Sequence, residues 1–183
     1  MCGERALMRI NVSQLLKEPV GSIRHYQANE IVDVAIEGNS SPVQGEVKLM
    51  RTDRSILVEG TLHTEVEITC SRCLGPFRCP LTFNIVEEYF PTVDVISGAR
   101  LTVPDEPGSF TIDEQHTLDL SEAIRQYCLI AVPMKPLCRE DCAGLCPSCG
   151  INLNQQQCHC PSQPIDPRWL ELAKLVKEPK GME

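Results

Sequence analysis

The sequence is poor in the residues that most often contact nucleic acids. Aromatic side chains make up 4% of its 183 residues, which is too few for a base-stacking platform. Lys and Arg number 17 against 25 Asp and Glu, and the resulting net charge of −8 has the wrong sign for binding phosphates through bulk charge. We therefore expect no DNA partner. Arg72 and Arg78 are local basic positions that could touch RNA, although solvated surface charge is the interpretation we favour for both.

Membrane and catalytic signals are also missing. No run of about 18 apolar residues is present, so the sequence predicts no transmembrane helix and no membrane partner. The N-terminal residues MCGERALM lack the apolar segment of a secretory signal, which favours a cytoplasmic protein. No G-x-S-x-G, phosphate-loop or H-E-x-x-H motif occurs, and the 4 histidines are scattered along the chain. We therefore expect no catalytic residues and no enzyme activity.

Cysteine, in contrast, is abundant, with 11 residues in the chain. In a reducing compartment, cysteine clusters bind metal more often than they form disulfides. Eight of the cysteines form close pairs, two of them C-x-x-C, one C-x-x-x-C and one C-x-C. The pairs are Cys70 with Cys73, Cys138 with Cys142, Cys146 with Cys149, and Cys158 with Cys160. Structural zinc takes four ligands in a tetrahedron, so we expect these eight residues to bind one or two Zn²⁺ ions.

The sequence leaves two ways of pairing these cysteines open. In the local pairing, the C-x-x-C at 146–149 joins the C-x-C at 158–160, and the other two pairs join each other. In the rival pairing, the two C-x-x-C knuckles join as in a zinc ribbon. An iron–sulfur cluster and a redox switch are alternatives to zinc, because four thiolates suit both. His159 could replace a neighbouring thiol, but a solvated histidine is the interpretation we favour.

Alternation of apolar and polar residues predicts strands over 30–37, 43–50, 56–69 and 81–85. A short strand at 110–112 is also indicated. Since short turns connect the consecutive strands, the pattern predicts an antiparallel meander.

Helical patterns occur in three places. Residues 12–18 predict a helical turn, and Asp119 with Glu122 three residues later predicts a capped helix start. Cys128 lies beside the apolar stripe of that second helix, so we interpret it as a core thiol. Asp166 followed by proline predicts the start of a C-terminal helix.

These patterns together predict an α+β fold, in which an antiparallel β-meander carries two or three short helices. We expect an α+β core domain over 8–137 and a cysteine-rich zinc-binding insert over 138–161. The C-terminal helix would follow over 162–178 and pack on the core.

Several stretches of the chain together resemble the YceD family, also called large ribosomal RNA subunit accumulation protein. The resemblance runs from Met8 to Val176, and the stretches that carry it are MRINVSQLLKEPVGS, CSRCLGPF, LDLSEAIRQYCLIAVPMKPLC, CAGLCPSCGINLN, CHC and DPRWLELAKL. The family's C-x-R-C falls on Cys70, Arg72 and Cys73. Its C-terminal cysteine block falls on the six cysteines between 138 and 160.

This resemblance implies a role in the accumulation of 23S ribosomal RNA and in biogenesis of the large ribosomal subunit. The implied partners are a ribosomal protein or the precursor large subunit with its 23S rRNA. The acidity of the chain favours a basic ribosomal protein as the direct partner, because opposite charges speed encounter. The alternative is a zinc-dependent thiol redox sensor or redox-regulated chaperone.

Overall fold

The structure of the protein is a computed structural model that describes residues 8–36, 39–104 and 108–161. The chain forms two compact units that divide after Cys142. The strands are β1 (Arg9–Asn11), β2 (Ile23–Ile36), β3 (Asn39–Arg51), β4 (Ile56–Thr69), β5 (Pro76–Pro91), β6 (Phe110–Ile112) and β7 (Thr117–Asp119). The helical elements are the 3₁₀ helix η1 (Leu15–Lys17) and the α-helix α1 (Ser121–Ala131).

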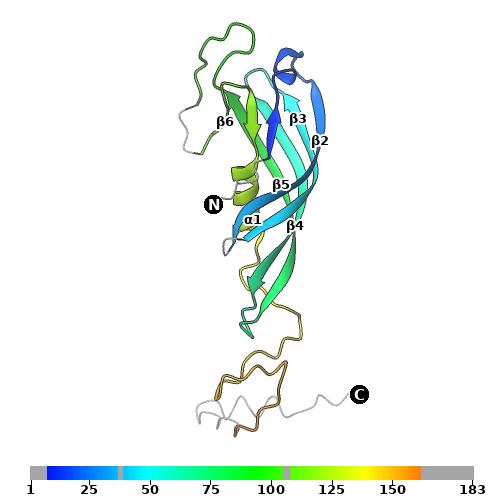
Figure 1. The fold of residues 1–183 in the computed structure, drawn as a ribbon, viewed down its shortest axis with the longest axis vertical. Helices are drawn as coiled ribbons and strands as arrows, with labels where there is room; N and C mark the ends of the chain where they lie inside the picture. The colour runs from blue at the N-terminus through cyan, green and yellow to red at the C-terminus, as the bar shows by residue number, and fades with distance from the viewer. Residues whose placement is uncertain (1–7, 37–38, 105–107, 162–183) are drawn as a thin grey trace, which may run out of the picture. The chain divides into compact units, whose positions relative to one another are not determined.

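One sheet in the order β1-β7-β6-β5-β4-β3-β2 dominates the first unit. Strands β2 to β5 pair antiparallel with their neighbours in sequence, as a meander. Strand β6 then joins β5 in parallel, and β1 pairs antiparallel with β7. Figure 1 shows that the long strands curl around α1.

The alternating sequence of β4 explains how its two faces are used. Val66 and Ile68 point into the core, whereas Glu65 and Glu67 are exposed on the other face. Successive side chains of a strand point to opposite faces, so this alternation buries one side of the sheet and leaves the other in water. The apolar face of the sheet and the apolar face of α1 thus share one core.

Helix α1 packs against β2 and β5 inside the curl of the sheet (Figure 1). Its buried residues are Ala123, Ile124 and Cys128. The helix begins close to the predicted start, but its N-cap is Leu120 and not Asp119; the Asp119 carboxylate accepts a hydrogen bond from the N–H of Ser121 at 2.9 Å. The helix covers β2, the last strand of the sheet, and coverage by a helix is one way in which proteins protect an edge strand.

The curl brings β3 and β4 very close together at Gly45. A Cβ atom on Gly45 would lie 2.2 Å from the carbonyl oxygen of Thr61, and the backbone φ of +155° also disfavours a side chain. We expect Gly45→Ala to lower the free energy of unfolding by about 3 kcal/mol, because the two strands must move apart. Urea denaturation measures this loss. Gln44→Ala, at an exposed position beside it, should change the stability little, and equal effects of the two substitutions would contradict the close approach.

The predicted α+β class is wrong, because the described residues are mostly β and include one α-helix. The meander was expected, but β2, β3 and β5 extend well beyond the predicted strands. Strands β1 and β7 have three residues each, which is too short for a period of two to be visible. The cysteine-rich residues 138–161 contain no helix and only an isolated bridge between Leu145 and Asn152. The C-terminal helix predicted over 162–178 lies outside the described residues, and the predicted domain boundaries stay predictions.

Candidate metal centres

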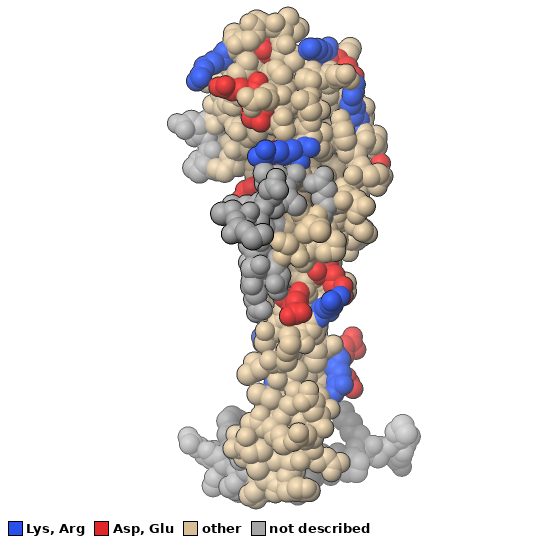
Figure 2. All heavy atoms as spheres, in the orientation of Figure 1, with Lys and Arg blue, Asp and Glu red and all other residues tan. Residues whose placement is uncertain are grey.

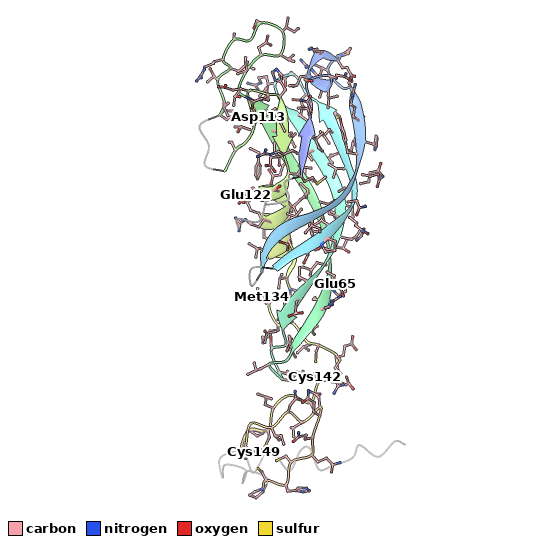
Figure 3. All side chains as sticks on the ribbon, in the orientation of Figure 1. Glu65, Asp113, Glu122, Met134, Cys142 and Cys149 are labelled. Atoms are coloured by element: carbon pink, nitrogen blue, oxygen red, sulfur yellow. The ribbon has the colours of Figure 1, made fainter. Side chains whose placement is uncertain are left out.

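The eight paired cysteines form two groups of four. The first quartet is Cys70, Cys73, Cys138 and Cys142, and the second quartet is Cys146, Cys149, Cys158 and Cys160. Within each quartet all sulfur atoms lie within 4.8 Å of one another. This grouping is the one that the local pairing predicts, not that of the zinc ribbon. Figure 3 labels one member of each quartet, Cys142 and Cys149.

The sulfur spacing fits a tetrahedral metal ion. With Zn–S bonds of about 2.3 Å, the sulfur atoms of a tetrahedron are about 3.8 Å apart. In the first quartet the Sγ–Sγ distance is 3.8 Å from Cys70 to Cys142 and also 3.8 Å from Cys73 to Cys138. In the second quartet Cys158 Sγ lies 3.3 Å from Cys146 Sγ and 3.6 Å from Cys149 Sγ. Each quartet therefore fits one ion, although the sulfur atoms of the second quartet would have to move slightly apart. Metal binding itself stays a prediction.

A tight turn at the end of the β4–β5 hairpin positions the first half of the first quartet. The N–H of Leu74 donates to the carbonyl of Cys70 at 3.0 Å, and the N–H of Cys70 donates to the carbonyl of Gly75 at 2.9 Å. Leu74 has a φ of +55°, which a non-glycine residue rarely adopts. This turn places the sulfur atoms of Cys70 and Cys73 on the same side.

The chain that follows α1 supplies the second half of the first quartet. The N–H of Ser71 donates to the carbonyl of Pro136 at 2.8 Å, which joins the hairpin to this returning segment. The N–H of Cys142 donates to the carbonyl of Arg139 at 3.2 Å and so turns the segment between its two cysteines. Cys70, Cys73 and Cys142 form a small buried cluster with Phe77 and Leu137 packed against it.

The second quartet has its own local scaffold. The N–H of Gly150 donates to the carbonyl of Cys146 at 2.9 Å, and Gly150 takes the left-handed φ of +73° that glycine permits. The N–H of Cys146 donates to the carbonyl of Ile151 at 2.8 Å. The amide oxygen of Asn154 accepts the N–H of Ala143 at 2.8 Å, which closes the loop around the knuckle.

Backbone N–H groups favour a thiolate in each quartet. The N–H groups of Cys73 and Cys138 lower the pKa of Cys70 to about 6. In the second quartet, those of Cys149 and Ser148 lower the pKa of Cys146 to about 6.

The pKa of one other thiol in each quartet is raised instead. Burial raises the pKa of Cys138 to about 12, and the hydrogen bond with the Cys158 thiol raises the pKa of Cys160 to about 12. In each quartet the surroundings thus favour the thiolate at one cysteine and the thiol at another. Metal binding would release the remaining protons.

The two quartets differ in exposure. In the first quartet the exposed fractions of Cys70, Cys142 and Cys73 are 0%, 3% and 8%, whereas Cys138 is exposed. In the second quartet only Cys146 is buried, at 7% exposure, while Cys149 is exposed and Cys158 and Cys160 are half-buried. Water and reagents thus reach the sulfur atoms of the second quartet more readily.

This difference predicts the order in which metal is lost. When a chelator is added to the zinc-loaded chain, we expect the second quartet to lose its ion first, because its thiolates are more accessible. Mass spectrometry with alkylation of the released thiols should find Cys149 modified before Cys70. Simultaneous modification of both cysteines would show that exposure does not control release.

The remaining predicted positions lie outside both quartets. Cys128 is fully buried, as expected of a core thiol, and burial raises its pKa to about 11. His159 is exposed, as expected of a solvated histidine. Arg72 is exposed, as expected of a solvated charge, but its guanidinium Nη1 also donates to the carbonyl of Cys142 at 3.1 Å. The only sequence signal for this contact is the position of Arg72 between two predicted ligands, Cys70 and Cys73.

Comparison with known proteins assigns the chain to a family. The family described as "Large ribosomal RNA subunit accumulation protein YceD" matches residues 58–176, a range that contains both quartets. The chain belongs to the YceD family. The printed family name concerns accumulation of large ribosomal subunit RNA. No solved structure matches the chain.

Relatives of this YceD chain occur in bacteria and plants. An uncharacterized protein of Mycobacterium tuberculosis is 34% identical over 131 residues, which cover 72% of this chain and 60% of the relative. A protein of Arabidopsis thaliana, named Large ribosomal RNA subunit accumulation protein YCED homolog 1, chloroplastic, is 26% identical over 176 residues. That match covers 82% of this chain and 54% of the plant protein. The chain thus spans 54–60% of the length of these relatives.

Within the described part of this YceD chain, no helix has the length and apolar composition needed to cross a bilayer.

Proposed function

We propose that this chain promotes accumulation of 23S ribosomal RNA and biogenesis of the large ribosomal subunit by binding a ribosomal component. Membership of the YceD family is the observation that carries this proposal. The chain acts as a binding factor without catalysis. In support, each candidate metal centre consists of four cysteines, whereas catalytic zinc sites keep one position open for water or substrate.

Zinc in the two quartets would have a structural role. When bound, the ion supplies a link among four thiolates that does not itself change oxidation state. The first quartet would fasten the β4–β5 hairpin to the segment after α1, since Cys70 and Cys142 come from these two parts. The second quartet would hold the loop from Cys146 to Cys160 closed on itself.

The charge of the chain favours a basic ribosomal protein as the direct partner. Each Zn²⁺ bound by four thiolates adds −2, so two such centres change the net charge from −8 to about −12. Residues 143–161 contain no Lys, Arg, Asp or Glu, and their described atoms are tan in Figure 2. With no cation to neutralise phosphate, residues 143–161 are poorly suited to bind an RNA backbone. Opposite charge speeds the encounter with a basic protein.

Sedimentation tests this proposal directly. A tagged copy in its native host should comigrate with particles near the large subunit on a sucrose gradient at low salt. Moderate salt should weaken the association, because screening reduces attraction between opposite charges. Pulldown should recover a ribosomal protein. If the chain stays at the top of the gradient at both salt concentrations, it has no stable ribosomal partner, and recovery of naked rRNA alone would contradict a protein partner.

A second candidate function is a redox sensor or redox-regulated chaperone that responds to loss of zinc. The exposed Cys149 in the second quartet is the observation that favours it. In this case, mild peroxide should release zinc and increase binding of an apolar dye. Retention of zinc at peroxide concentrations that oxidise free cysteine would exclude the redox function.

A further inference from the structure

We infer that Arg72 is a positioning residue of the first quartet, which holds Cys142 in place and so strengthens metal binding there. This inference rests on the proposed zinc in that quartet. Arg72 lies between two ligands on the hairpin turn, and its side chain reaches the chain segment that carries the other two.

The contacts of Arg72 span the junction between the two halves of the quartet. Its Nη1 donates to the carbonyl of Cys142 at 3.1 Å, and it lies 3.5 Å from the carbonyl of Glu140. In sequence, Cys142 is 70 residues and Glu140 is 68 residues away from Arg72. Arg72 therefore fixes the backbone of a ligand that local structure in the hairpin cannot reach.

No carboxylate of the described residues competes for the Arg72 guanidinium. Among the described residues, Arg72 forms no ion pair. Arg78 on the same hairpin does form one, with 3.7 Å between its Nη1 and Glu65 Oε2. A charged donor strengthens a hydrogen bond to a carbonyl. Its positive charge also lies beside a centre that would carry −2 with zinc bound. Both effects stabilise the closed quartet relative to one from which Cys142 has moved away.

Arg72 would act through the ligand and not on the metal itself. Polar groups that orient a metal ligand typically change metal affinity by about 10–100-fold when they are removed. The first quartet has a second link of the same kind, the backbone bond from Ser71 to Pro136 at 2.8 Å. That bond holds the segment 136–142 at its start, just before Cys138. Arg72 holds the same segment at its end, at Cys142.

The test uses the full chain loaded with ¹¹³Cd²⁺, which gives one NMR signal for each occupied quartet. EDTA competition then measures the affinity of each quartet separately. We expect Arg72→Ala to weaken the first quartet about 10–100-fold and to leave the second quartet unchanged. Arg72→Lys, which keeps the charge and loses the forked donors, should give an intermediate loss. Arg78→Ala is the matched control and should change neither affinity.

Each outcome decides the inference. Equal affinities of the first quartet in the wild-type chain and in both Arg72 variants would overturn the role of Arg72 while leaving two metal centres in place. Absence of a first-quartet signal in the wild-type chain would overturn the proposed metal in that quartet together with the role of Arg72. If Arg72→Ala also weakens the second quartet, it acts by general unfolding, and the positioning role is wrong. Should Arg72→Ala fail to fold, Arg72→Lys still decides, since it must lose affinity at the first quartet alone.

Discussion

Cys146→Ser is expected to remove one of the two metal ions and to unfold residues 143–161 while the sheet stays folded. The side chain of Cys146 is 7% exposed and belongs to the second quartet, and a serine hydroxyl is a poor replacement for a thiolate ligand. Small metal units depend on the ion for folding, with apparent contributions of about 10–16 kcal/mol for structural zinc. The main hydrophobic core contains no residue of the second quartet, so it should keep its stability.

Metal content and backbone NMR spectra of the variant test this expectation. Zinc per chain should fall from two to one, and signals from 143–161 should collapse to the narrow range of an unfolded segment. Cys79→Ser is a matched control, because Cys79 is a half-buried cysteine outside both quartets and its loss should leave the metal content unchanged. If Cys146→Ser keeps two zinc ions, the assignment of the second quartet is wrong.

The four cysteine pairs could be predicted because the spacing within each pair is local. A C-x-x-C turn and a C-x-C turn each bring two thiols to one side of the backbone within a few residues. Which pairs meet depends on the fold, and here the meeting of Cys70 with Cys142 requires α1 to return the chain to the tip of the β4–β5 hairpin. A sequence pattern contains no direct information on that return.

The part of the fold with the strongest alternation was also the most predictable. Strand β4 runs from Ile56 to Thr69, the whole range that the sequence predicts, because Val66 and Ile68 alternate with acids. Strand β2 extends seven residues before the predicted start at residue 30, because its exposed face there holds Ile23, which hides the contrast between the two faces. The helix count differs for another reason: residues 12–18 form only the three-residue 3₁₀ helix η1, and the predicted C-terminal helix lies outside the described residues.

The contact of Arg72 shows why side-chain roles are harder to predict than ligand sets. Its neighbours in the sequence favoured the interpretation of Arg72 as a solvated charge. The exposed position of Arg72 on the turn agrees with that interpretation. Its hydrogen bond to Cys142 depends on a carbonyl 70 residues away. The sequence places Arg72 between two ligands, but only the three-dimensional arrangement shows which carbonyl it binds.

The packing of α1 into the curled sheet predicts opposite outcomes for two isoleucines of the same helix. Ile124 is 0% exposed, whereas Ile130 is 80% exposed. Ile124→Ala should lower the free energy of unfolding by about 2–5 kcal/mol, because it leaves a cavity between the helix and the sheet. Ile130→Ala should change it by less than about 0.5 kcal/mol. Urea denaturation of the metal-loaded chain measures both.

This pair isolates packing from helix formation. Alanine has a higher helix propensity than isoleucine, but this advantage is less than about 1 kcal/mol at either position, so a large difference between the two variants reports burial. A large difference would establish that α1 completes the core of the sheet. Similar losses for Ile124→Ala and Ile130→Ala would mean that the outer face of α1 is also covered, which would place a partner or another part of the chain on Ile130.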